Sequence, residues 1–119
     1  MTQAGANAGL RRKQRMAIEH AEHGKVVDLN TFGGTASTAV VKEKEFEAIR
    51  VYLGPGKKIP PHKVDGPITV HCLSGSCTFF VEDEPRSLAP GSWLFLEGGT
   101  MHALEAEEEC AVLVTILFT

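Results

Sequence analysis

The chain has 119 residues, of which 43% are hydrophobic, and its formal net charge is −3 at neutral pH. A chain of this length forms one domain around a single core. Nucleic-acid binding normally requires a basic surface, which a chain with a net negative charge does not supply. No apolar run is long enough to cross a bilayer, and the N-terminus lacks the apolar centre of a signal peptide. We therefore expect a cytoplasmic protein that binds neither membranes nor nucleic acid.

The first 24 residues differ in composition from the rest of the chain. Residues 1–9 are mostly small and polar, whereas Leu10–His23 contains good helix formers with apolar residues near a 3.6-residue period. Gly24 suits the position that follows the last residue of a helix. The pattern predicts an arm with a short helix over 1–24 and a β-domain over 25–119.

From Lys25 onward the sequence is typical of short strands separated by glycine and proline turns. Pro60 and Pro61 indicate a stiff, extended approach to His62. The segments expected as strands are Val26–Val27, Thr38–Val41, Phe46–Leu53, Ile68–Leu73, Cys77–Glu82, Arg86–Leu88, Trp93–Leu96, a segment with His102, and Cys110–Phe118. Such a series predicts an all-β fold, an antiparallel sandwich or barrel.

Cys72, Cys77 and Cys110 all lie in apolar, strand-like segments. Because their number is odd and the expected compartment is reducing, they do not form a disulfide framework. We predict reduced thiols that pack in the core.

Two glycine-spaced histidine motifs are the most informative feature of the chain. Their residues are Gly56, His62 and Gly75 in the first motif, and Gly91, Gly99 and His102 in the second. The spacing resembles the two signature motifs of the cupin superfamily, G-x5-H-x-H-x3-E-x6-G and G-x5-P-x-G-x2-H-x3-N. The resemblance implies a cupin-type double-stranded β-helix, or jelly-roll barrel, with the short N-terminal helix outside it.

Four positions differ from these motifs. Val64 and Ile68 replace the second histidine and the glutamate of the first motif, and Glu97 and Ala106 replace the proline and the asparagine of the second. The resemblance implies that a cupin metal is held in the barrel lumen by three histidines and one glutamate. Here it leaves two of those positions, His62 and His102, as candidate ligands.

A third ligand would have to come from outside the motif pattern, and His71 and Cys72 are the candidates. Strand alternation places Ile68 and Cys72 on one face and His71 on the other, unless a bulge reverses the order. Glu97 has two interpretations, a base or ligand at the barrel mouth or an exposed turn residue, and we favour the second. The metal would be one divalent transition ion, namely iron, manganese, nickel, copper or zinc.

Val64, Ile68 and Val70 make the expected lumen apolar, which suits a small organic ligand. Three functions remain open: a barrel that binds a small molecule, a metal-dependent enzyme of the dioxygenase or isomerase type that uses His62 and His102, and a scaffold without a ligand. The sequence does not decide whether the protein is an enzyme, because one fold hosts many activities. Cys110–Phe118 is apolar on both faces, so we also expect a homodimer.

Overall fold

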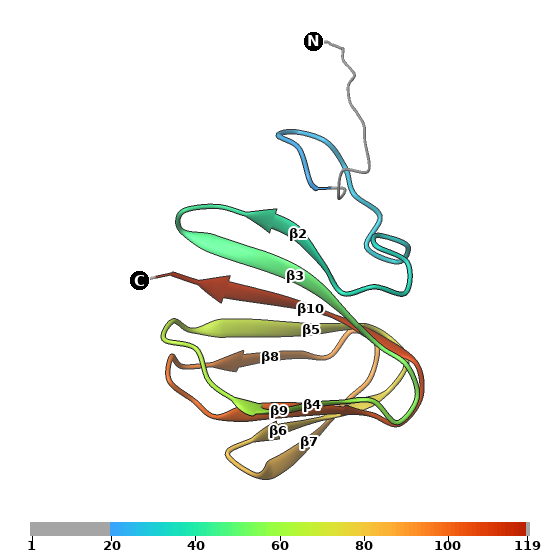
Figure 1. Ribbon diagram of the computed structural model, residues 1–119, viewed down its shortest axis with the longest axis vertical. Coiled ribbons are helices and arrows are strands. Elements are labelled where there is room, and N and C mark those ends of the chain that lie inside the picture. Colours follow the sequence, from blue (N-terminus) through green and yellow to red (C-terminus); the bar gives the residue numbers. More distant parts are fainter. Residues whose placement is uncertain (1–19, 119) are drawn as a thin grey trace.

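The computed structural model describes residues 20–118. In this part of the chain every regular element is a β-strand, and nine strands form two antiparallel sheets that face each other (Figure 1). The predicted all-β class is therefore confirmed. Because residues 20–118 contain no helix, no membrane-spanning helix is found among them.

The strands divide into a larger and a smaller sheet. The five-stranded sheet has the spatial order β2 (Thr38–Lys42), β3 (Phe46–Leu53), β10 (Cys110–Leu117), β5 (Ile68–Ser74) and β8 (Trp93–Leu96). The four-stranded sheet has the order β4 (Lys58–His62), β9 (His102–Ala106), β6 (Cys77–Val81) and β7 (Glu84–Leu88). Neighbours in space are mostly distant in sequence, as in a barrel whose chain crosses between its two sheets.

The prolines of β4 occupy an edge of the smaller sheet. Pro60 and Pro61 have no N–H group to donate, so they are tolerated in a strand only at an edge or a bulge. The pairing of β4 with β9 is irregular between Ile59 and His62, where the prolines lie. The extended approach to His62 that the sequence predicts is therefore a paired edge strand.

The predictions of a helix and a first strand near the N-terminus are either wrong or lie outside the described residues. Residues 10–19 of the predicted helix lie outside the described residues, and residues 20–23 are not helical. The predicted strand at Val26–Val27 is wrong. Val26 is 99% exposed, and Val27 packs against a small hydrophobic cluster without pairing as a strand. A two-residue apolar run is too short to indicate strand pairing on its own.

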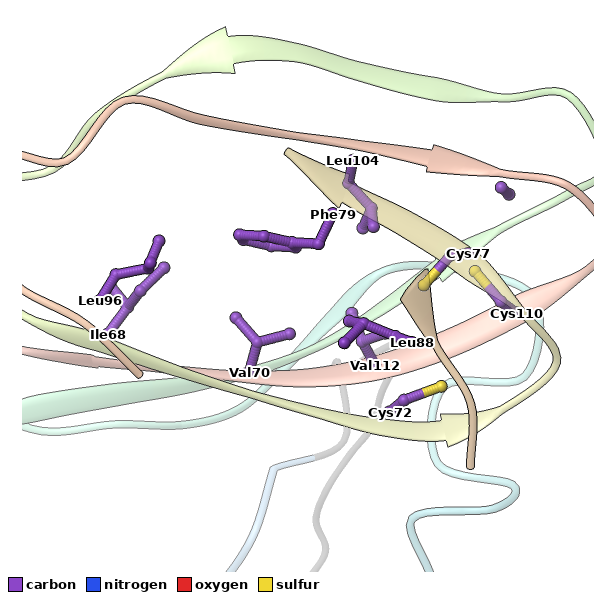
Figure 2. Packing of buried hydrophobic residues seen from close by; sticks show 11 residues of the cluster. Ile68, Val70, Cys72, Cys77, Phe79, Leu88, Leu96, Leu104, Cys110 and Val112 are labelled. Carbon is purple, nitrogen blue, oxygen red and sulfur yellow. The ribbon is translucent and has the colours of Figure 1, made fainter. Parts of the chain in front are cut away.

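The main core lies between the two sheets (Figure 2). The fully buried members of β5 alternate along the strand, as Ile68, Val70 and Cys72, whereas His71 is only half-buried. This is the alternation that the sequence predicts. Leu96 packs beside Ile68 at one end of the cluster, and the three cysteines lie at the other end.

The three cysteines are free and buried, which confirms their prediction as reduced core residues. Burial raises the pKa of the thiols of Cys72, Cys77 and Cys110, because a thiolate is poorly solvated in an apolar core. The thiols are therefore protonated at neutral pH and pack as small apolar groups.

A second cluster lies on the outer face of the larger sheet. Phe32, Val40 and Ala48 form its buried centre. Beside it Arg50 of β3 is only 4% exposed. Its guanidinium donates three hydrogen bonds to carbonyl oxygens of one loop, those of Leu29 at 2.6 Å, Gly34 at 2.8 Å and Asn30 at 3.1 Å. Arg50 therefore fastens the loop of residues 28–34 to the sheet.

Replacement of Arg50 by methionine removes these donors and keeps most of the apolar stem. We expect Arg50→Met to lower the free energy of unfolding by about 2–4 kcal/mol, because three carbonyls lose a charged donor at once. Amide hydrogen exchange should rise first in residues 28–36. Arg86→Met is the matched control, since Arg86 is exposed and its side chain bonds, among residues 20–118, only to the carbonyl of Pro85. Equal losses in the two variants would contradict the proposed role of Arg50.

Candidate functional site

A cavity of about 140 Å³ lies between the two sheets. Its wall is formed by Ile49, Val51, Ile59, His62, Val64, Ile68, Phe79, His102, Ala103, Leu104, Val114 and Ile116. Ten of these residues are apolar and none carries a fixed charge. The cavity is therefore an apolar chamber whose polar side chains are two histidines.

The two histidines come from neighbouring strands of the smaller sheet. His62 ends β4, His102 begins β9, and the strand register pairs them directly. Their ring centroids lie 4.3 Å apart, with the ring planes inclined by 59°. On its other side His102 stacks on the ring of Phe79, with centroids 5.6 Å apart and planes inclined by 9°. His102 is buried and His62 is exposed, so the pair runs from the cavity wall to the surface.

Each imidazole is held by a backbone carbonyl two residues before it. Nδ1 of His62 lies 3.0 Å from the oxygen of Pro60, and Nδ1 of His102 lies 2.9 Å from the oxygen of Thr100. A carbonyl oxygen only accepts hydrogen bonds, so Nδ1 carries the proton in both rings. In a neutral ring this leaves Nε2 as a hydrogen-bond acceptor or metal ligand.

Burial lowers the pKa of His102 below the ordinary value of histidine. The carbonyl of Thr100 acts in the opposite direction, and the neighbouring His62 lowers the pKa further. The net direction is downward, so His102 is neutral at neutral pH. Its Nε2 atom then has a free lone pair.

The other predicted site residues do not all lie beside the two histidines. Val64 and Ile68 line the cavity, whereas Val70 is not part of its wall and packs in the core. His71 faces away from the lumen, because β5 pairs with β8 in regular register and no bulge reverses its direction.

The remaining candidates also lie apart from the histidine pair. Cys72 is buried with the other two cysteines at the end of the core away from Ile68 and Leu96 (Figure 2), and it does not line the cavity. Glu97 is an exposed turn residue, the interpretation that we favoured, and it too is absent from the cavity wall.

No family model matches the sequence, and no curated protein matches it. Solved structures do match its fold. A conserved protein of unknown function from Streptococcus pyogenes is 26% identical, with a TM-score of 0.74 over 86% of this chain and 94% of that one. A cupin superfamily protein from Desulfitobacterium hafniense is 17% identical, with a TM-score of 0.67 over 70% and 76% of the two chains.

A cupin 2 conserved barrel domain protein from Leptotrichia buccalis is 24% identical, with a TM-score of 0.66 over 82% of this chain and 43% of that one. The chain therefore has the cupin fold. The barrel expected from the two motifs is thereby confirmed. At these identities the cupin likeness extends to the fold alone, so the activity of this chain has to be argued from its own site.

The donor set of this barrel does not fit a complete metal site of the kind that the motif resemblance implies. Among residues 20–118 no group of three or more histidine, cysteine, aspartate or glutamate side chains is close enough to hold a metal ion. His62 and His102 offer two ring nitrogens, whereas Val64 and Ile68 have no ligand atoms. Metal sites in proteins generally use three or four protein ligands.

Most of the cavity wall was missed at the sequence level. Ile49, Val114 and Ile116 belong to strands that were predicted, and alternation alone would have placed Val114 and Ile116 on one face of β10. The signal that was lacking is the pairing of β10 between β3 and β5, which brings Ile49 opposite Val114.

Two loops cross at the cavity end that carries His102. The N–H of Gly99 donates to the carbonyl of Val64 at 2.8 Å, and Gly99 has a φ of +81°, which favours glycine. The neighbouring Gly98 lies against the carbonyl of Asp65 so closely that a Cβ atom would overlap it. Gly98 and the motif residue Gly99 therefore let one loop lie directly on the other and place His102 beside His62.

Replacement of Gly98 by alanine should separate these loops. We expect Gly98→Ala to lower the unfolding free energy by about 2 kcal/mol and to shift the NMR signals of the His62 and His102 rings, because the new methyl group meets a backbone carbonyl that has little room to move. Gly54→Ala is the matched control, since a Cβ there would make only an ordinary contact with Lys57. Unshifted ring signals in Gly98→Ala would show that the crossing does not position the pair.

Proposed function

We propose that this cupin binds a small organic molecule in the barrel lumen, with His62 and His102 as its polar contacts. The observation that supports this most directly is the cavity of about 140 Å³ beside the two rings. Protein interiors are normally packed with few voids larger than a water molecule. An apolar chamber with a few convergent polar groups is the usual form of a small-molecule site.

The other two functions have less support. A barrel that served only as a scaffold would be expected to fill its lumen with side chains, as this one does at the cysteine end but not beside His102. A metal-dependent enzyme would need ligands beyond the two imidazoles, and residues 20–118 gather none. Binding of one divalent transition metal by His62 and His102 therefore stays a prediction.

A phenylalanine at Val114 would project into the cavity, because Val114 lines it from β10. We expect Val114→Phe to weaken the binding of single-ring organic probes at least tenfold, since the new ring occupies much of the space. Binding is measured by ligand-observed NMR. The control is Thr115→Phe. Thr115 is the next residue of the same strand and faces the other side of the sheet, so this variant adds the same ring outside the lumen.

Equal binding by both variants would contradict a site in the lumen. Metal analysis of the same preparations tests the enzyme alternative. A divalent ion near one equivalent per chain, lost in both His62→Ala and His102→Ala, would favour that alternative over a metal-free binding barrel.

We also propose that two copies associate through the outer face of β5 and β8. The other half of this sheet face is covered by Phe32 and the loop that Arg50 holds. On the β8 half Trp93 is 62% exposed and Phe95 is 51% exposed. The strand register places Trp93 beside His71 and Phe95 beside Thr69, so the patch contains no acidic group, lysine or arginine. An identical copy could cover it without desolvating a fixed charge.

Trp93 is the single tryptophan of the chain, so its fluorescence reports on this surface. We expect sedimentation to show a dimer, and Trp93 emission to shift to longer wavelength on dilution. Phe95→Glu should give a monomer, because dimerisation would bury the charge of the new glutamate. Met101→Glu is the control, since it changes an exposed apolar residue outside the patch, and it should stay a dimer. A monomeric wild-type protein would contradict the proposal. If Trp93 of that monomer were also protected from a fluorescence quencher, another part of the chain would cover the patch.

A further inference from the structure

Polar side chains are scarce in the cavity wall. The wall contains no lysine, arginine, aspartate, glutamate, serine, threonine or amide side chain. Its hydrogen-bonding side chains are His62 and His102, and the Nδ1 atom of each is already bonded to a backbone carbonyl. The remaining ring nitrogens are the two Nε2 atoms.

Both Nε2 atoms are acceptors when the rings are neutral, because the proton of each ring lies on Nδ1. The ring centroids lie 4.3 Å apart and both histidines line the cavity, so the two acceptors belong to the same part of its wall. His102 is buried, and a buried acceptor without a donor is costly, so a ligand that enters this end gains most if it brings a donor. A carboxylate or phosphate would bring only acceptors and a charge that no side chain of the wall balances.

The size of the cavity limits the ligand as well. An engineered apolar cavity of about 150 Å³ holds one benzene molecule, and this cavity measures about 140 Å³. The ligand fragment that fits is therefore about as large as one six-membered ring or a short branched chain.

We infer that the ligand of this cavity is a small apolar molecule with a hydrogen-bond donor head group: a hydroxyl, which donates its one proton to Nε2 of either His102 or His62, or an amine, which has a proton for each. The inference rests on the proposed function, since it specifies the ligand of the same lumen site. It assigns the two histidines the role of specificity determinants, with the apolar wall supplying most of the affinity.

Three probes of similar size separate the possibilities: benzyl alcohol carries a donor, toluene carries no polar group, and benzoate is an anion without a donor at pH 8. Dissociation constants are measured at that pH from the NMR shifts of the isoleucine and valine methyl groups of the cavity. We expect benzyl alcohol to bind about tenfold more tightly than toluene, and benzoate to bind at least tenfold more weakly than benzyl alcohol.

The variant His102→Phe keeps an aromatic ring and removes the buried acceptor, so it should bring benzyl alcohol most of the way down to the affinity of toluene, since the acceptor that remains belongs to His62, which is exposed. His71→Phe is the matched control, because His71 faces away from the lumen, and it should keep the tenfold preference. If His102→Phe does not fold, the three-probe comparison on the wild-type protein decides alone. Toluene binding as tightly as benzyl alcohol, or benzoate binding best, would overturn the inference and leave the lumen site standing. No binding of any probe would overturn the lumen site itself.

Discussion

The position of β10 in the larger sheet is the constraint on which the rest of the structure depends. This strand pairs along its whole length with β3 and over most of it with β5, two strands that lie far from it in sequence. Its inner face supplies Val112 to the core and Val114 and Ile116 to the cavity, and its outer face places Leu113 against the second cluster. An apolar strand in the centre of a sheet can serve both faces because successive side chains point in opposite directions.

The lumen is packed differently at its two ends. At one end Cys72, Cys77 and Cys110 are almost completely buried, and their small side chains pack in the core between the facing sheets (Figure 2). At the other end the wall residues do not meet across the lumen, and a cavity remains beside His102. An empty apolar volume lowers stability. Its presence beside the one pair of polar side chains in the wall is consistent with a site kept for binding.

The histidine pair differs from a complete cupin metal centre in its chemistry more than in its position. The backbone carbonyls of Pro60 and Thr100 orient the two rings in the manner of outer-shell partners of metal-bound histidines. The other two motif positions, Val64 and Ile68, contribute apolar surface in place of ligand atoms. The same barrel end that would hold an ion with four ligands therefore offers two acceptors and an apolar wall.

Local sequence predicted much of the strand set. Phe46–Leu53 was predicted with the bounds that β3 has in the structure, and the outward direction of His71 followed from alternation. Residues 20–23 and Val26–Val27 were assigned wrongly. Their regular structure would have depended on partners that the fold does not supply. Arg50 gave no signal in the sequence, because its partners are backbone carbonyls of a loop about 20 residues away.

The sequence by itself determined the fold class, because glycine turns and alternating apolar residues are local constraints on the backbone, and the motif resemblance implied that His62 and His102 share one site. Tertiary structure alone decided which strands are neighbours, that Val70 packs in the core while Ile116 lines the cavity, and that Cys72 lies away from the histidines. These outcomes depend on how two sheets pack face to face. No short stretch of sequence contains that information, because each contact joins residues from strands that are distant in the chain.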